Sequence, residues 1–320
     1  MKKILVTGGF GFIGSHFVKY QLEKHPDDFV VILDLLTYAG KLSNLEGAKV
    51  NENLDMMQGD ICDKNLVKRA FDKYNFDYVV NFAAETHVDN SIKKPSRFIS
   101  TNIVGVATLL DIAKENWNGN LDKRFLQIST DEVYGSLKLN EERFTETSYL
   151  KPSSPYSASK TAADLLVLAY YRTFNIPVLI TRSSNNYGTN QDYEKLIPHM
   201  AINAFNNQPL PIYGDGQNIR DWVYVKDHCE AINTVLRRGR VGEIYNVGGN
   251  KELTNLEIVN KILEVLGKPT SLIKFVGDRL GHDRRYAVNT SKIEKELGWK
   301  STTQFETALE ETVKWYKNEV

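Results

Sequence analysis

The chain has 320 residues, of which 42% are hydrophobic and 25% are charged. This length is enough for one large domain or two modest ones with a sizeable core. Forty basic residues balance forty acidic ones, and a net charge near zero argues against a general binder of nucleic acid or of anionic membranes. We therefore expect neither nucleic acid nor a membrane among the partners of this protein.

The cysteines and histidines further limit the class of protein and the kinds of site that we expect. Cys62 and Cys229 are the two cysteines of the chain, and two cysteines cannot build a disulfide framework, so we expect reduced thiols in a cytoplasmic protein. The apolar run after Lys2 and Lys3 is too short for the core of a signal peptide, and no stretch approaches the roughly 18 apolar residues of a membrane span. The six histidines show no metal-ligand spacing, so no metal is expected.

The first half of the chain alternates short apolar runs with helical spacing. The expected strands cover residues 3–7, 29–33, 54–58, 78–82, 125–129 and 178–182, and the expected helices cover residues 15–24, 66–74, 98–116 and 161–174. Such alternation implies right-handed crossovers and a parallel sheet with helices on both faces. The predicted fold class is therefore α/β, with a doubly wound, Rossmann-type sheet.

The alternation weakens after about residue 183, where turn signals accumulate. The runs Thr254–Glu257 and Ser291–Glu294 both fit the capping box that begins a helix, and Gly267 is expected to close the first of these helices. We interpret this half as a smaller, irregular substrate-binding lobe that covers the carboxyl edge of the sheet. The expected domains are residues 1–182 and 183–320, with the chain allowed to cross between them.

A glycine turn follows the first expected strand. Gly8, Gly11 and Gly14 leave room for a tight turn, for a pyrophosphate against bare backbone and for close packing of helix on strand. Asp34 ends the second strand, twenty residues beyond Gly14, where a carboxylate accepts hydrogen bonds from the adenosine ribose and repels a 2′-phosphate. The pattern predicts a dinucleotide site and favours NAD over NADP. The alternative is a structural turn with Asp34 as an ordinary strand-end residue.

Two further strand ends lie at the same edge of the predicted sheet. Asp60 and Ile61 follow the third strand and could hold the adenine, although an aspartate at that position is more often only a turn former. Ala83 and Ala84 follow the fourth strand, where small side chains would let a cofactor approach closely. Ligands of open α/β sheets bind at this carboxyl edge.

Tyr156 and Lys160 are four residues apart, so on a helix they share one face. A nearby ammonium favours the phenolate and lowers the pKa of a tyrosine from its ordinary value of about 10. A phenolate at neutral pH can take the proton from a sugar hydroxyl while hydride leaves the same carbon. The spacing alone is common by chance, but the glycine turn and Thr130 after the fifth strand strengthen the functional interpretation.

Asp131 and Glu132 follow Thr130 directly, and hydride transfer alone needs neither of them. Once C4 of a hexose is a ketone, the C5 proton becomes acidic. Glu132 could then remove that proton as a base, while Asp131 protonates the departing C6 hydroxyl as an acid. The alternative is a solvated loop start, since acidic residues are usually exposed. Beside the tyrosine and lysine, the pair predicts a dehydratase with a built-in redox cofactor.

Taken together, the motifs resemble the extended short-chain dehydrogenase/reductases, and most closely the dTDP-glucose 4,6-dehydratases of that family. The resemblance runs nearly end to end, through residues 7–14, 83–89, 129–135, 156–160, 184–188, 194–198, 213–216, 219–222 and 281–286. Epimerases share the glycine turn and the Tyr156/Lys160 pair, whereas residues 130–132 and 281–286 are far more specific to the dehydratases. The chain departs from the family pattern in residues 188–193, which lack the usual prolines, and at Leu280, where proline is usual.

The resemblance implies a role for each matching position. Tyr156 would be the base for oxidation, Lys160 its electrostatic partner and a ribose contact, and Thr130 a hydrogen-bond partner of the C4 oxygen. Further positions implied to hold NAD are Phe12, Ile13, Thr37, Thr101 and Asn186. Positions implied to hold the nucleotide sugar are Thr86, His87, Asn185, Lys195, Leu196, Pro211, Tyr213, Arg220, Asn255, Arg279, His282 and Tyr286. Arginine and lysine suit phosphate geometry, although each basic residue taken singly is more often a solvated surface charge.

The implied function is NAD-dependent dehydration of dTDP-glucose to its 4-keto-6-deoxy form. The implied assembly is a cytoplasmic homodimer that pairs through the helices at residues 98–116 and 161–174. The main alternatives among enzymes are an NAD-dependent nucleotide-sugar 4-epimerase, a decarboxylase that uses the same NAD chemistry and a UDP-sugar dehydratase. A non-catalytic dinucleotide sensor on the same fold is a further alternative. Asp131 and Glu132 discriminate between dehydratase and epimerase, since a 4-epimerase needs neither a C5 base nor a C6 acid.

Overall fold

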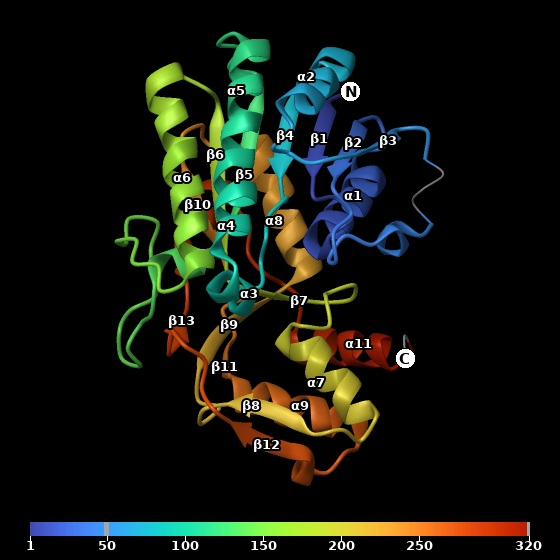
Figure 1. Cartoon of the computed structure of the whole chain (residues 1–320), viewed down its shortest axis with the longest axis vertical. Helices are drawn as coiled ribbons and strands as arrows, with labels where there is room; N and C mark the ends of the chain where they lie inside the picture. Colours follow the sequence, from blue (N-terminus) through green and yellow to red (C-terminus); the bar gives the residue numbers. More distant parts are fainter. Residues whose placement is uncertain (48–50, 319–320) are drawn as a thin grey trace.

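A computed structural model describes residues 1–47 and 51–318 of the chain. A seven-stranded parallel sheet fills the upper part of Figure 1, with the strand order β10-β6-β5-β4-β1-β2-β3. The order changes direction beside β1, so the switch point of this doubly wound sheet lies next to the glycine turn. The strands are β1 (Lys3–Thr7), β2 (Phe29–Asp34), β3 (Leu54–Gln58), β4 (Tyr78–Asn81), β5 (Arg124–Thr130), β6 (Val178–Ser183) and β10 (Ile244–Val247).

Helices cover both faces of the sheet, which confirms the predicted fold class (Figure 1). Helices α1 (Phe12–Lys24) and α8 (Val225–Arg238) pack on one face, and α2 (Lys64–Tyr74), α5 (Val106–Trp117) and α6 (Pro155–Phe174) pack on the other. Ile4 and Val6 of β1 join the first of these cores and Leu5 joins the second. Because both faces of the central strands are buried, β1, β2 and β4 are nearly continuous apolar runs, whereas the edge strand β3 is partly exposed.

The helix expected at residues 98–116 is interrupted. It comprises α4 (Pro95–Ile99), the π-helical turn η2 (Ser100–Gly105) and α5, and a short helix α3 (Val88–Lys93) precedes it. Gly105 lets this segment approach the end of β3, because a Cβ on Gly105 would lie 2.5 Å from Cδ1 of Ile61. The close approach is a tertiary contact, so helical spacing in the sequence did not reveal the irregular turn.

Helix α6 begins six residues earlier than the expected residue 161. Ser154 caps its N-terminus through a capping box with Ser157, and Pro155 occupies the first helical position, where its missing N–H costs nothing. The helix therefore carries both Tyr156 and Lys160, as their spacing predicted.

The remainder of the second half forms a smaller lobe below the carboxyl edge of the sheet (Figure 1). Its strands are β7 (Asn185–Tyr187), β8 (Leu210–Tyr213), β9 (Ile219–Tyr224), β11 (Glu252–Thr254), β12 (Ile273–Val276) and β13 (Arg285–Tyr286), and its helices are α7 (Leu196–Phe205), α9 (Asn255–Leu266) and α11 (Phe305–Asn318). Short turns are η1 (Leu42–Leu45), η3 (Asp131–Tyr134) and η4 (Thr270–Leu272).

The chain crosses between the lobe and the sheet more than once. After β9 it returns to the sheet as α8 and β10, and α10 (Ser291–Leu297) packs beside β10. The division into residues 1–182 and 183–320 stays a prediction, and the last two residues of the second part lie outside the described residues.

One of the two expected capping boxes is present. Thr254 and Glu257 cap α9 reciprocally, and Gly267 ends that helix with a left-handed φ of 62°. The prediction for Ser291 was wrong, because Thr290 is the N-cap of α10 and its hydroxyl donates to the Glu294 carboxylate at 2.6 Å. The Ser291 N–H is already bound by the side chain of Asn289, so no reciprocal cap is needed there.

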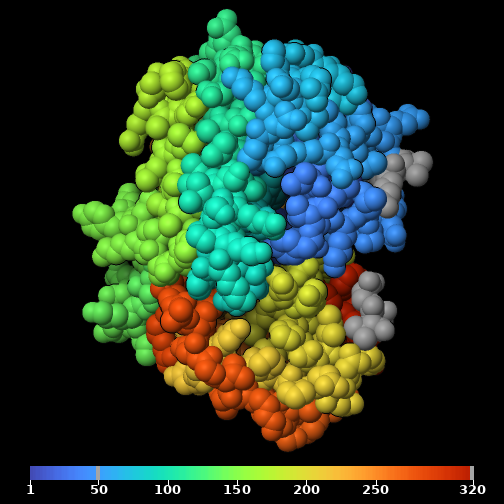
Figure 2. Space-filling model, viewed as in Figure 1, coloured from blue at the N-terminus to red at the C-terminus, as the bar shows by residue number. Residues whose placement is uncertain are grey.

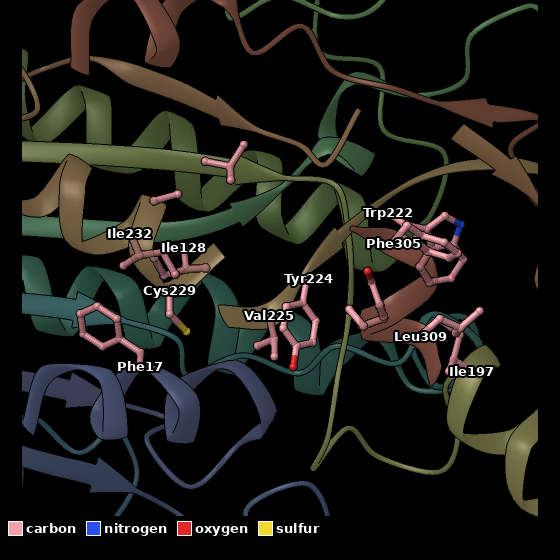
Figure 3. Packing of buried hydrophobic residues seen from close by; sticks show 14 of the residues in the cluster. Phe17, Ile128, Ile197, Trp222, Tyr224, Val225, Cys229, Ile232, Phe305 and Leu309 are labelled. Atoms are coloured by element: carbon pink, nitrogen blue, oxygen red, sulfur yellow. The ribbon is translucent and has the colours of Figure 1, made fainter. Parts of the chain in front are cut away.

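A single apolar core continues from the sheet into the lobe, as Figure 3 shows. At the sheet end it includes Phe17 of α1 and Ile128 of β5, and at the lobe end Phe305 and Leu309 of α11. Tyr224, at the end of β9, lies between them. Because a core packed to crystal-like density resists deformation, this continuity fixes the lobe against the edge of the sheet.

The turn at Gly14 leaves no space for a side chain, since an added Cβ would lie 2.2 Å from the Gly8 carbonyl oxygen. We expect Gly14→Ala to lower the free energy of unfolding by about 1–3 kcal/mol, because overpacking forces the backbone to shift. Gly277→Ala is the matched control, since nothing lies within 4 Å of its added Cβ. Urea unfolding of both variants measures the difference, and equal transition midpoints would contradict the close helix–strand packing.

Candidate active site

A pocket of about 310 Å³ opens at the carboxyl edge of the main sheet, where the lobe meets it. Its walls come from the glycine turn, the ends of β2 to β6, the turn η2, the start of α6 and the loop after β7. In Figure 2 the N-terminal segment (blue), the segment after β4 (cyan) and the segment after β6 (yellow) meet at the front of the molecule. Parallel strands carry their carboxyl ends to the same edge, which explains how distant segments share one pocket.

The residues expected to hold the cofactor are brought together by this pocket. Every one of them lines its walls, and so does the expected catalytic set. The first group is Gly8, Gly11, Phe12, Ile13, Gly14, Asp34, Thr37, Asp60, Ile61, Ala83, Ala84, Thr101 and Asn186, and the second is Thr130, Asp131, Glu132, Tyr156 and Lys160. The individual role of each residue stays a prediction.

The glycine turn forms a cradle of bare backbone. Gly8 has a left-handed φ of 68°, and a Cβ on it would lie 2.7 Å from the Ala83 amide nitrogen, so the turn passes directly against the end of β4. A Cβ on Gly11 would lie 3.2 Å from the Gly8 carbonyl oxygen. Glycine at these positions therefore keeps the floor of the pocket open for a flat, charged group such as a pyrophosphate.

Asp34, at the end of β2, is part of the pocket wall. Its carboxylate accepts hydrogen bonds from the backbone N–H groups of Phe10, at 2.9 Å, and Leu36, at 2.8 Å. Because a carboxylate offers about four lone-pair sites, it retains acceptor capacity for ribose hydroxyls. The cradle and this acceptor together fit a dinucleotide without a 2′-phosphate.

Tyr156 and Lys160 are buried where α6 meets β5. The Lys160 ammonium donates to the Ile128 carbonyl at 2.7 Å, and burial lowers the pKa of Lys160 to about 8. Burial first and then Glu132 raise the pKa of Tyr156 above its ordinary value, while a hydrogen bond with Thr130 lowers it. The expected lowering by Lys160 was wrong for this arrangement, because burial and the neighbouring carboxylates favour the neutral phenol.

Asp131 and Glu132 have unlike surroundings, although they are neighbours in the turn η3. Burial, Glu132 and Asp221 raise the pKa of Asp131 well above its usual range, and its Oδ2 has no hydrogen-bond partner among the described residues. Burial also raises the pKa of Glu132, but the cations of three lobe residues oppose that rise. Environments that shift the pKa values of two carboxyl groups to different extents make one of them an acid and the other a base.

The three opposing cations are Lys195, Arg279 and Arg220, in decreasing order of effect on Glu132. The Lys195 ammonium donates to the Thr86 carbonyl at 3.1 Å. Arg220 donates to the Asp283 carbonyl at 3.0 Å, and its guanidinium lies 4.4 Å from the ring centre of Tyr286. The sheet thus supplies the carboxylates and the lobe supplies the cations that face them.

The expected substrate residues divide into two groups. Thr86, Asn185 and Lys195 line the pocket, whereas His87, Leu196, Pro211, Tyr213, Arg220, Asn255, Arg279, His282 and Tyr286 are not among its walls. Arg220 and Arg279 nevertheless act on Glu132 through their charge. Tyr213 is 44% exposed and packs edge-on against His282, which leaves an aromatic face open to solvent.

Several pocket residues were missed by sequence reasoning, among them Glu85, Ser183, Ser184, Gln191 and Asp192. Ser183 ends β6, so the rule that ligands bind at strand ends would have found it. Gln191 and Asp192 lie in an irregular loop without a recognisable pattern.

His228 of α8 was also missed, and it accounts for the placement of Asn186. Its Nδ1 lies 2.7 Å from the Asn186 side-chain oxygen. The Asn186 side-chain nitrogen donates to the Ser184 carbonyl at 3.0 Å. Burial lowers the pKa of His228 to about 3, so the ring is neutral and holds the amide through one hydrogen bond.

The comparison with protein families agrees with this geometry. The family model described as GDP-mannose 4,6 dehydratase matches residues 5–312. The chain belongs to this family. A dTDP-glucose 4,6-dehydratase from Haemophilus influenzae is 52% identical to it, with 99% of this chain and 98% of the relative covered.

Solved structures of the family show the same architecture. A dTDP-glucose 4,6-dehydratase from Streptomyces venezuelae, with NAD and TYD bound, superposes with a TM-score of 0.94 at 46% identity, covering 99% of this chain and 97% of that one. A UDP-glucose 4-epimerase from Thermus thermophilus in complex with NAD gives 0.90 at 29% identity, covering 99% and 100%. Since both activities occur on this fold, the site residues must distinguish them.

The described residues hold no helix long and apolar enough to cross a bilayer. Within the same residues, no group of three or more His, Cys, Asp or Glu side chains is arranged to hold a metal ion.

Proposed function

We propose that this protein dehydrates dTDP-glucose to dTDP-4-keto-6-deoxy-glucose, with NAD regenerated in each cycle. The observation that carries the proposal is the pair Asp131 and Glu132, whose pKa values are pushed apart, beside Tyr156 and Lys160 in one pocket. The relatives at about half identity over nearly the whole chain carry the same activity in their names.

Bound NAD would supply the redox chemistry, as acceptor of a hydride from C4 of the sugar and as its donor to C6. The glycine cradle would hold its pyrophosphate, and Asp34 its adenosine ribose. Lys160, which burial keeps close to neutral range with a pKa of about 8, would contact the second ribose and provide positive charge beside Tyr156.

Three protein groups would move the protons. Tyr156 would take the C4 hydroxyl proton in its phenolate form, beside the Lys160 ammonium, as that carbon is oxidised, with Thr130 hydrogen-bonded to the same oxygen. Glu132 then takes the C5 proton, which the C4 ketone has made acidic. Asp131 donates its proton to the C6 hydroxyl, which leaves as water. The enone that results takes hydride at C6 and a proton at C5, which completes the 4-keto-6-deoxy product. Each such acid or base role typically contributes about 10²–10⁴-fold in rate.

Cations in the lobe favour a diphosphate-linked substrate. Lys195 lines the pocket, and Arg220 and Arg279 act with it on Glu132 through their charge. Guanidinium groups bind phosphate oxygens bidentately. The structure of the Streptomyces relative with TYD bound supports dTDP as the carrier. An epimerase has no use for the paired carboxylates, so the dehydratase is the better assignment.

We also propose a homodimer that pairs through the α4–η2 segment and α6. Ile99 and Val104 are 53% and 49% exposed, Leu165 of α6 is 54% exposed, and η2 packs against α6. Large apolar side chains exposed on adjoining elements are typical of an interface. A cytoplasmic location is part of the same proposal, supported by the two unpaired cysteines.

The first test is mass spectrometry of dTDP-glucose incubated with the purified protein and no added reductant. We expect the loss of one water without net accumulation of NADH, because the hydride returns to the product. An unchanged mass would contradict the proposal. UDP-glucose and an isomer analysis of each product would then distinguish a UDP-sugar dehydratase from an epimerase.

Glu132→Gln should still oxidise C4 but slow the exchange of the C5 hydrogen with solvent by about 10²–10⁴-fold, since the base is lost. In the unchanged protein, exchange should fall as the pH drops through the pKa of Glu132, which lies above the ordinary value of 4.5, because the protonated form cannot act as a base. Deuterium incorporation at C5 is the measurement. Glu142→Gln, at an exposed position, is the control, and full exchange in Glu132→Gln would assign the base elsewhere.

Val104→Asp combined with Leu165→Asp should convert the dimer to a monomer, because two buried charges per subunit would be unpaired at the interface. Sedimentation velocity of the 36.4 kDa chain measures this. Leu139→Asp, at a position 62% exposed on a separate loop, should leave the dimer intact. A monomeric parent protein would refute the proposed pairing.

A further inference from the structure

Asp164 and Arg182 form an ion pair behind the proposed active site, out of contact with water. The Arg182 Nε lies 2.9 Å from the Asp164 Oδ2, and the two side chains are 2% and 0% exposed. Asp164 belongs to α6, one turn after Lys160, and Arg182 belongs to the adjacent strand β6. Burying two charges costs desolvation energy that their attraction often fails to repay, so stability alone is a weak reason for such a pair.

The carboxylate of the pair acts on Lys160, which together with Tyr156 forms the redox half of the site. Asp164 is the group whose charge opposes the effect of burial on Lys160. The hydrogen bond from Lys160 goes to a neutral acceptor, the Ile128 carbonyl. The Oδ1 atom of Asp164 has no hydrogen-bond partner among the described residues, so its charge is not fully satisfied by Arg182.

The guanidinium of the pair contacts the turn η3, which carries Asp131 and Glu132, the acid–base half of the site. The carbon centre of the Arg182 guanidinium lies 4.8 Å from the ring centre of Tyr134, an arrangement that is favourable in a desolvated setting. Tyr134 is the last residue of η3, the turn that begins at Asp131 and includes Glu132. Its hydroxyl donates to the Asn246 side-chain oxygen at 2.7 Å, so the ring is held on two sides.

We propose that the Asp164–Arg182 pair is a positioning unit that couples the two halves of the reaction centre. Its carboxylate keeps Lys160 in the ammonium form, and its guanidinium supports the turn that presents Asp131 and Glu132. This inference rests on the proposed function, but the protonation state of Lys160 can be measured whatever the substrate is.

The surroundings of Lys160 leave Asp164 as the nearby source of negative charge on its own helix. Strand β5 contributes a backbone carbonyl, and the α4–η2 segment contributes neutral contacts, Phe98 against Tyr156 and Asn102 against Ser159. Helix α5 contributes Asp111, which accepts from Tyr170 near the far end of α6. The charged groups that act on Tyr156 and Lys160 include Glu132, Asp131 and Asp164. Asp164 is paired with Arg182, which faces Tyr134, and Asp283 accepts a hydrogen bond from Ser153, just before α6.

The carboxylate half of the proposal is tested by ¹³C NMR titration of Lys160 in the full-length protein, with the resonance assigned by its loss in Lys160→Arg. We expect Asp164→Asn to lower the titration midpoint of Lys160 by about one pH unit or more, since an opposite charge within a few ångströms shifts a pKa by about 1–3 units. The alkaline limb of the turnover–pH profile should move in the same direction by the same amount.

Because Asp164→Asn leaves Arg182 charged and unpaired, it can unfold the protein. The double substitution Asp164→Leu with Arg182→Met removes both charges and retains apolar volume, a change that buried ion pairs often tolerate. It should show the same lowered Lys160 midpoint. A folded double variant that titrates like the parent would overturn the proposal, and so would failure of both variants to fold, since the pair would then be a structural element only.

Asp28→Asn is the matched control, because Asp28 and Arg237 form another largely buried pair, with 2.6 Å between Nη2 and Oδ2, that lies outside the pocket walls. It should reduce stability without moving the Lys160 midpoint. If the parent protein fails to dehydrate dTDP-glucose while the midpoint shifts as expected, the proposed function falls and the electrostatic coupling stands.

The guanidinium half is tested by Arg182→Lys, which keeps a positive charge near Asp164 but loses the flat group over Tyr134. We expect an unchanged Lys160 midpoint, together with C5 exchange and kcat lowered about tenfold and KM largely retained. Wild-type exchange in this variant would overturn the supporting role of Arg182. The NMR midpoint separates this outcome from a general loss of structure.

Discussion

The low dielectric constant of the buried region between the sheet and the lobe governs the chemistry of this protein. Asp131, Tyr156 and Lys160 are 1%, 8% and 5% exposed, so every charge near them acts more strongly than it would in water. Burial raises the pKa of both the aspartate and the tyrosine, and lowers that of the lysine. The other charged residues of the site either oppose or increase these pKa shifts.

Charged residues of the lobe and of α6 oppose these pKa shifts. Lys195, Arg220 and Arg279 reach Glu132 from the lobe and oppose the rise of its pKa, while Asp164 reaches Lys160 from within α6. The lobe cations thereby favour the carboxylate form of Glu132, while burial and the neighbouring carboxylates favour the protonated form of Asp131. The acid and the base have adjacent positions in the chain, and the difference between them comes from which neighbours each one faces.

Rigid placement is as necessary as charge. Gly8 and Gly14 bring the first helix and the end of β4 within contact distances that a Cβ would prevent, and the continuous core from Phe17 to Leu309 joins the sheet to the lobe. The cations of the lobe can therefore act on carboxylates of the sheet at a fixed separation. The capping box at Ser154 adds local order to the turn of α6 that carries Tyr156.

Local sequence patterns predicted the alternation of strands and helices, the glycine cradle and the placing of Asp131 and Glu132 beside Tyr156 and Lys160. These features are local, because glycine conformations, apolar periodicity and the spacing of Tyr156 and Lys160 act over a few residues. The irregular turn η2, the raised pKa of Tyr156 and the Asp164–Arg182 pair depend on tertiary structure. Each of these depends on segments far apart in the chain, and burial and electrostatic coupling arise only when the packed structure brings such segments together.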